Sequence, residues 1–270
     1  MKMSLQNIVE FQFTANPTYG IQRLRMTPKE SERQKILSWE IILKGAKKEI
    51  EYVDHHGNVC VLLTFEKDTK SVSVLAQGDV EINKTNGVTN EEPLIPKWLF
   101  KRHTELAKPG VAIKKFCRNL TGFTGSDLDL VYKVANKLRQ TLKYEIGSTK
   151  VETVAEEAFL LKKGVCQDFA HIYISCMRLL NFPARYVSGY MHKNQNDSEF
   201  QATHAWAELF IKDLGWIGFD PTNKCCPDER YIRVSCGLDA SYAAPIRGVF
   251  YGETKEDLDI SVQTLESSAQ

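Results

Sequence analysis

Hydrophobic and polar residues alternate along the first third of the chain with the period of a β-strand. Val9, Phe11 and Phe13 are separated by polar residues, and side chains two residues apart lie on the same face of a strand. Similar alternating or apolar runs occupy Leu37–Leu43, Ile50–Val53, Val59–Phe65 and Val72–Ile82. The Gly57-Asn58 step favours a hairpin between two of these runs. Residues 1–83 are therefore predicted to form a β-rich domain.

This alternation ends at residues 84–97, where Asn, Gly and Pro interrupt every periodicity. Such a segment is typical of a loop, and we expect an inter-domain linker here. Beyond it, apolar residues recur every three or four positions, which is the spacing of a helix. The expected helices are Asp127–Lys143, Thr153–Lys163 and a third that begins near Cys166 and ends at Asn181-Phe182-Pro183.

The second expected helix carries signals at both ends. Thr153 and Glu156 have the spacing of a capping box, and Gly164 is expected to be its C-cap. Three strand-like runs follow the third helix: Ala184–Met191, His204–Ile211 and Gly215–Asp220. Residues 98–270 are therefore predicted to form one α+β domain.

Bulk properties exclude several classes of protein. The chain has 270 residues, of which 43% are hydrophobic and 26% charged, and these values are typical of a soluble globular protein. A net charge of +1 provides no attraction toward nucleic acid or an anionic membrane. We find no secretory signal and no apolar run of about 18 residues. Seven irregularly spaced cysteines favour a reducing compartment over a disulfide framework, so a cytoplasmic location is expected.

Cys166 is the cysteine that the expected elements place at the start of a helix. Backbone N–H groups and the positive end of the helix dipole gather there. Both stabilise negative charge on sulfur, and the thiolate is the nucleophilic form. The same N–H groups are suited to hold the oxyanion of a tetrahedral intermediate. Taken singly, however, a cysteine is more often a buried packing residue.

His204 and Asp220 provide the partners that a cysteine nucleophile needs. His204 begins one strand-like run and Asp220 ends the next, with three residues between the runs. An antiparallel hairpin places the start of one strand beside the end of the other. A carboxylate on one imidazole nitrogen would set the tautomer and turn the other nitrogen toward the thiol. Cys166, His204 and Asp220 are therefore predicted to form a catalytic triad.

Three segments resemble the core motifs of the transglutaminase-like superfamily. They read GVCQDFAHIYISCMRLLNFPARYVSGY, THAWAELFI and GWIGFDPTN. More narrowly, they are similar to a bacterial branch described as cysteine proteases. The segment RYIRVSCGLDASYAAPIRGVFYG resembles the C-terminal part of that branch, and the β-rich half with its DHHGN sequence resembles its N-terminal domain.

The resemblance implies a papain-like α+β core, with a Cys-bearing helix packed on an antiparallel sheet. It implies Cys166 as nucleophile, His204 as base and Asp220 as the third member. It also implies amide chemistry through a thioester on a peptide or protein substrate, without a cofactor. The chain departs from the branch at Leu238, where an Arg is usual. That departure bears on the substrate groove or on local salt bridging rather than on the triad.

Other residues near the motifs have both functional and structural interpretations. Gln167 and Tyr144 are oxyanion candidates, and Trp206 is a candidate wall of a substrate groove, although packing is the more frequent role of such residues. We predict no metal site at Cys225, Cys226 and Cys236, because their spacing does not match zinc ligands. His55 and His56 are expected to be exposed beside a turn.

The motifs leave the acceptor of the acyl group open. Water as acceptor would make the protein a peptidase or amidase, and an amine would make it a cross-linking transglutaminase. We favour hydrolysis, because the sequence lacks a recognisable calcium-loop pattern. A glycan–asparagine amidase and a non-catalytic binding module remain as alternatives. The oligomeric state and the role of the N-terminal domain are not indicated.

Overall fold

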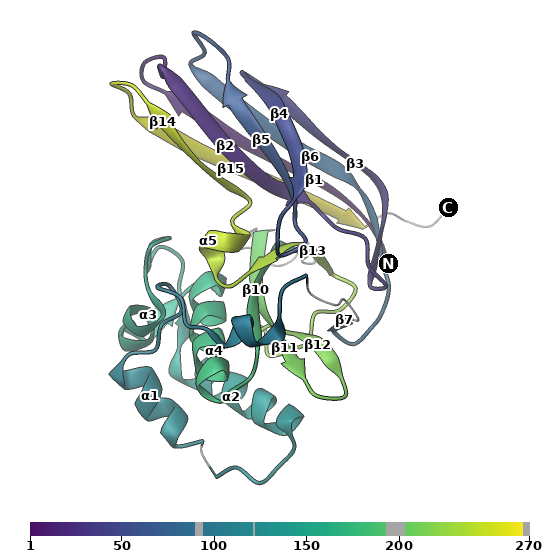
Figure 1. Ribbon diagram of the computed structural model, residues 1–270, viewed down its shortest axis with the longest axis vertical. Helices are drawn as coiled ribbons and strands as arrows, with labels where there is room; N and C mark the ends of the chain where they lie inside the picture. The colour runs from purple at the N-terminus through teal and green to yellow at the C-terminus, as the bar shows by residue number, and fades with distance from the viewer. Residues whose placement is uncertain (90–93, 121, 193–202, 267–270) are drawn as a thin grey trace.

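A computed structural model describes residues 1–89, 94–120, 122–192 and 203–266. The chain forms a β-sandwich, at the top of Figure 1, and an α+β body below it. The sandwich strands are β1 (Lys2–Phe13), β2 (Tyr19–Thr27), β3 (Gln34–Lys44), β4 (Ala46–Val53), β5 (Val59–Phe65), β6 (Ser71–Ile82), β14 (Ile246–Tyr251) and β15 (Glu256–Glu266).

The sandwich consists of two antiparallel sheets, in the orders β15-β1-β6-β3 and β14-β2-β5-β4. Their inward faces carry the alternating apolar residues of the N-terminal strands, including Val9, Phe11 and Phe13. β4 and β5 are adjacent antiparallel strands, and Gly57 in the turn between them has a φ of 81°, which glycine adopts without strain. The predicted β-rich domain and its hairpin are thus present.

The C-terminus corrects the expected domain boundaries. β14 pairs with β2 and β15 pairs with β1, so residues 246–266 belong to the sandwich and not to a catalytic domain of residues 98–270. Ile246 and Phe250 of β14 pack against the sandwich core, which explains why the chain returns there. Neighbouring strands far apart in sequence cannot be identified from a local pattern.

The α+β body surrounds a five-stranded antiparallel sheet in the order β13-β10-β11-β12-β7. Helix α4 packs against this sheet (Figure 1) and is buried from Asp168 to Arg178. The elements of the body are β7 (Val88–Thr89), η1 (Lys97–Lys101), α1 (Val111–Arg118), α2 (Asp127–Thr141), β8 (Lys143–Tyr144), α3 (Ala155–Leu161), β9 (Lys163–Gly164), α4 (Cys166–Leu179), β10 (Ala184–Met191), β11 (Thr203–Ile211), β12 (Gly215–Phe219), β13 (Tyr231–Gly237) and α5 (Ala240–Ala243).

Two local predictions in this body are wrong. Residues 84–97 are not only a linker, because β7 lies within them and pairs with β12. Residues 90–93 lie outside the described part.

The capping box predicted for Thr153 and Glu156 does not form, because helix α3 begins at Ala155. The Glu156 carboxylate accepts the N–H groups of Gly110, Ala112 and Ile113 at the start of α1, at 2.9, 2.6 and 3.1 Å. Glu156 therefore caps a neighbouring helix instead of its own.

The C-cap prediction for the same helix also fails. α3 ends at Leu161, and Lys162 follows it in the left-handed conformation with a φ of 56°. Gly164 lies in β9, which pairs in parallel with β8.

In the described residues no helix combines the length and apolar character needed to cross a membrane.

Candidate active site

Cys166 is the first residue of helix α4 and is half-buried. The residue before it, Val165, has an extended backbone, and its N–H donates to Asp168 Oδ2 at 2.8 Å. The hydroxyl of Thr149 donates to the same oxygen at 2.7 Å. Asp168 therefore fixes the entry of the chain into the helix, in the manner of a residue at the third helical position. The Cys166 thiol is thereby held at the positive end of the helix.

His204 and Asp220 lie together at one end of the five-stranded sheet. β11 and β12 pair with Ala207 opposite Phe219, so the start of β11 reaches the residue after β12. His204 Nε2 is 2.6 Å from Asp220 Oδ2. Because a carboxylate can only accept, Nε2 carries the proton and Nδ1 is left for another partner. The expected proximity of His204 and Asp220 is present.

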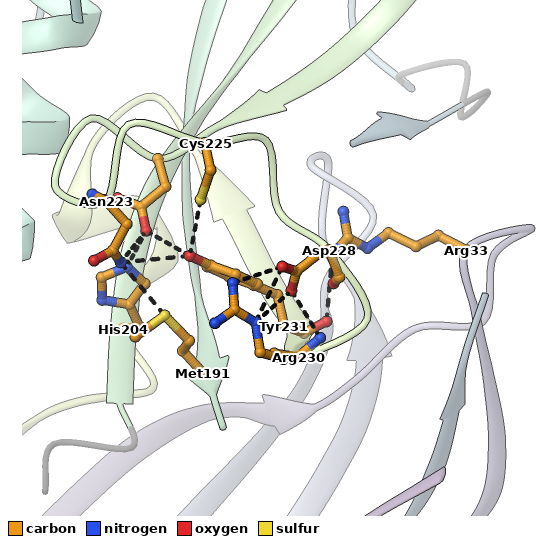
Figure 2. A network of polar contacts seen from close by, with 9 residues as sticks. Arg33, Met191, His204, Asn223, Cys225, Asp228, Arg230 and Tyr231 are labelled. Atoms are coloured by element: carbon orange, nitrogen blue, oxygen red, sulfur yellow. Dashed lines mark hydrogen bonds and ion pairs between the residues drawn. The ribbon is translucent and has the colours of Figure 1, made fainter. Parts of the chain in front are cut away.

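Asp220 is fully buried and accepts a large set of hydrogen bonds. Oδ1 accepts the N–H groups of Thr222 and Asn223 at 2.8 and 3.1 Å. Oδ2 accepts Asn223 Nδ2 at 2.7 Å and Tyr231 Oη at 2.9 Å, in addition to His204. Figure 2 shows the side chains of His204, Asn223 and Tyr231 lying close together. Burial alone would raise the pKa of Asp220, but His204 and the hydrogen bonds from Asn223 lower it, so the carboxylate stays ionised.

The Cys166 side chain also acts on the His204 ring and raises the pKa of the imidazole. Since Nε2 is occupied by Asp220, Nδ1 is the ring nitrogen that remains for a further partner. Burial lowers the pKa of His204, but Asp220 and Cys166 more than offset burial and raise that pKa to about 10. An imidazolium held by a carboxylate favours negative charge on a neighbouring sulfur.

The raised pKa of His204 predicts a pH-dependent stability. The folded protein holds this proton up to about pH 10, whereas an unperturbed imidazole has a pKa of 6.5. The stabilisation is therefore complete below pH 6.5 and is lost as the pH rises toward about 10. We expect the contribution of His204 to the free energy of unfolding, taken relative to His204→Gln, to fall by roughly 2–4 kcal/mol over this range. Urea unfolding of wild type and His204→Gln measures it; an equal pH slope in both proteins contradicts the expectation.

Comparisons with known proteins agree with this geometry. Residues 114–221 match the family model of the transglutaminase-like superfamily, and residues 4–81 match that of the bacterial transglutaminase-like N-terminal region. This chain carries a transglutaminase-like core. The family expected from the motifs is thereby confirmed.

Relatives of this transglutaminase-like chain span its whole length. An uncharacterized protein of Mycobacterium tuberculosis is 26% identical over 95% of this chain and 90% of its own. A crystal structure from Cytophaga hutchinsonii, described as a "Putative Cysteine Protease", has a TM-score of 0.78 and 22% identity, and the match covers 100% of this chain and 92% of that one. The likeness confirms the α+β fold class with its N-terminal β domain.

A further relative matches a smaller part of this chain. The protein-glutamine gamma-glutamyltransferase of Pseudomonas aeruginosa is 29% identical over 103 residues. That match covers 36% of this chain and 15% of the other protein.

The three lesser site candidates have structural contacts. Trp206 is buried, with its ring 6.3 Å from that of His204 and 5.6 Å from that of Tyr231, so it packs against both rings. Gln167 Nε2 donates to the carbonyl of Val151 at 2.9 Å. Tyr144 in β8 has its ring 6.4 Å from that of Phe169. The Gln167 side chain is thus engaged by the Val151 carbonyl.

Two residues of the site escape a sequence-based search. Asn223 donates to Asp220 with both its backbone and side chain, and its position three residues after an Asp is a usable turn signal. Tyr231 donates from the first residue of β13. No sequence spacing reveals that contact, because it depends on β13 returning to the edge of the sheet.

The structure also places the other residues that the sequence singles out. Leu238, which replaces the usual Arg, packs with Phe100 and Trp216 in an apolar cluster. All seven cysteines are free, and no group of three or more His, Cys, Asp or Glu side chains among the described residues is placed to hold a metal ion. His56, expected to be exposed, is buried against Phe100 and Tyr242.

Proposed function

We propose that this chain is a cysteine amidase or peptidase that works through a thioester on Cys166. The observation that carries the proposal is the position of His204, whose Nε2 meets Asp220 Oδ2 and whose pKa is raised by Cys166 as well as by Asp220. This is the order of contacts needed for nucleophilic catalysis by a thiolate. The substrate class is a peptide or protein amide.

The first half of the reaction forms the acyl-enzyme. The Cys166 thiolate attacks the carbonyl carbon of the amide and forms a C–S bond. The backbone N–H groups at the start of α4 are suited to stabilise the oxyanion that develops. The imidazolium of His204 then gives its proton to the leaving nitrogen, the C–N bond breaks, and a thioester and a free amine result.

The second half of the reaction regenerates the thiolate. Neutral His204 takes a proton from water, the oxygen attacks the thioester carbonyl, and the C–S bond breaks to release the acid. Asp220 keeps its charge throughout and holds the imidazole in place. The seven free cysteines support a reducing compartment such as the cytoplasm as the place of this reaction.

Transfer to an amine is the second candidate function. The name of the Pseudomonas relative, protein-glutamine gamma-glutamyltransferase, supports it, because the same thioester can react with an amine in place of water. Adding a primary amine during turnover separates the two functions. An amide product indicates transfer, and the free acid alone indicates hydrolysis.

Alkylation with iodoacetamide tests the activated thiolate without a known substrate. At about pH 6, unpaired thiols are almost entirely protonated and react slowly. We expect Cys166 to react at least about tenfold faster than Cys225 and Cys226, which are also half-buried and whose pKa values are raised by burial. Peptide mass spectrometry measures the rate at each site. Equal rates at the three cysteines would exclude an activated Cys166.

A His204→Ala variant assigns the cause of the selectivity. Without the imidazolium, the rate at Cys166 is expected to fall by about tenfold or more at the same pH. An unchanged rate would show that His204 is not the activator.

The same alkylation assay and a substrate screen separate the remaining alternatives. A protein in which Cys166 is alkylated fastest, and which cleaves a glycosylated asparagine but no peptide in a library, would be the glycan amidase. A selective thiol with no turnover of either would indicate a binding module.

A further inference from the structure

β13 is the edge strand of the five-stranded sheet, and its outer edge is paired by side chains of the sandwich. Gln34 donates from Nε2 to the carbonyl of Arg233 at 2.7 Å and accepts the Arg233 N–H at 2.9 Å. Asn58 makes the same pair of bonds with Cys236, both at 2.8 Å. Two carboxamides thus take the place of a neighbouring strand and satisfy the open edge.

The apolar face of β13 is fixed to the sandwich as well. Ile232 and Val234 are buried in one cluster with Met3, Leu5 and Val80. Close-packed interiors of this kind resist sliding. Packing against the sandwich therefore fixes the position of β13, which begins with Tyr231. The Tyr231 hydroxyl donates to Asp220.

Arg33 extends this contact to the turn before β13. Its Nη2 donates to the carbonyl of Asp228 at 2.7 Å and lies 3.5 Å from the carbonyl of Tyr231. The Asp228 carbonyl also accepts the N–H of Tyr231 at 3.2 Å, which closes the turn. Figure 2 shows the guanidinium of Arg33 approaching this turn from the sandwich, on the side opposite His204. Arg33 is buried, so its guanidinium lies inside the interface between the sandwich and the α+β body.

We propose that Arg33 is a positioning residue for the catalytic centre: by holding the Asp228–Tyr231 turn, it keeps the Tyr231 hydroxyl on Asp220. The inference rests on the proposed roles of Cys166, His204 and Asp220. It gives the N-terminal domain a function, because a residue of the sandwich side then stabilises the position of Asp220 through Tyr231. Arg33 touches neither the substrate nor the reacting atoms, and acts only through Tyr231.

A double-mutant cycle on the full chain tests this path. Tyr231→Phe keeps the ring and removes the hydroxyl, and Arg33→Met removes the guanidinium. The readout is the rate of Cys166 alkylation by iodoacetamide as a function of pH, with thermal unfolding measured in parallel. Each single variant is expected to lower the rate at about pH 6 roughly threefold to tenfold, the range for weakening one hydrogen bond to a charged group. In the Tyr231→Phe background, Arg33→Met should lower the rate no further.

Arg230→Met is the matched control, because it lies in the same turn but on its exposed side. Arg230 donates to the Asp228 carboxylate through Nε and Nη2 at 3.0 and 2.6 Å. Its loss should leave the alkylation rate of Cys166 unchanged. A merely structural role of Arg33 would lower the unfolding temperature and leave the pH profile of Cys166 unmoved.

The outcomes separate the inference from the proposed function. The inference is overturned if Arg33→Met leaves the alkylation rate of Cys166 at the wild-type value. It is also overturned if Arg33→Met lowers this rate equally in the wild-type and Tyr231→Phe proteins. A wild-type Cys166 that reacts no faster than Cys226 overturns the proposed function instead. If Arg33→Met does not fold, the cycle is run with Arg33→Lys. The Lys ammonium cannot reproduce the planar guanidinium with its several N–H donors. We then expect a smaller decrease in the alkylation rate, and no decrease in the Tyr231→Phe background.

Discussion

Replacing Cys166 by Ala is expected to lower the rate of amide cleavage by about 10⁴-fold or more. The thiol supplies the bond through which the acyl group is held, and no other described group on the His204 ring can replace it. Folding should be little affected, because Cys166 is only half-buried at a helix start. The expected defect is therefore in turnover and not in the amount of folded protein.

A peptide-amide library screened with wild type and Cys166→Ala measures this loss. Cys226→Ala is the control: it removes a thiol of similar exposure that contacts Tyr132 at 3.3 Å, and should leave turnover within about twofold of wild type. Cleavage that persists in Cys166→Ala would assign the chemistry to another residue.

Asp220→Asn is expected to lower turnover by about 10²- to 10⁴-fold. The carboxylate raises the pKa of His204, and without it the imidazolium beside Cys166 is lost at neutral pH. Asn also supplies one acceptor oxygen and one donor NH2. Five donor groups converge on Asp220, so some of them must face the NH2 without an acceptor. A lower unfolding temperature is expected as well.

The pH profile of Cys166 alkylation and the turnover rate together measure the effect of Asp220→Asn. Asp228→Asn is a suitable control, since that carboxylate belongs to a partly exposed pair with Arg230 and has no contact with His204 among those described. It should leave both measurements close to wild type. An Asp220→Asn protein with normal turnover would remove Asp220 from the mechanism.

Local patterns were sufficient for the elements that carry the three central residues. Helix α4 begins at Cys166 because the apolar face from Phe169 onward has helical spacing. The short connection between β11 and β12 brings His204 to Asp220. Both features depend on residues near one another in the sequence, and such features follow from period and turn length alone.

Features that depend on distant segments could not be predicted in this way. Glu156 has the spacing of a capping residue but finds the N–H groups of α1 instead. β14 and β15 complete sheets that begin at the N-terminus. The contacts of Tyr231 with Asp220 and of Arg33 with Asp228 join segments 11 and 195 residues apart. Only tertiary packing determines which of many possible partners such groups meet.

The acyl-enzyme itself provides the most direct test of the central claim. An activated ester such as p-nitrophenyl acetate acylates a reactive thiolate, and the thioester is detected by intact-mass and peptide mass spectrometry. The account predicts one acetyl group on Cys166, absent from Cys166→Ala, much reduced in His204→Ala and released by hydroxylamine. Acetylation of another residue, or none on Cys166 in the folded wild-type protein, would contradict it.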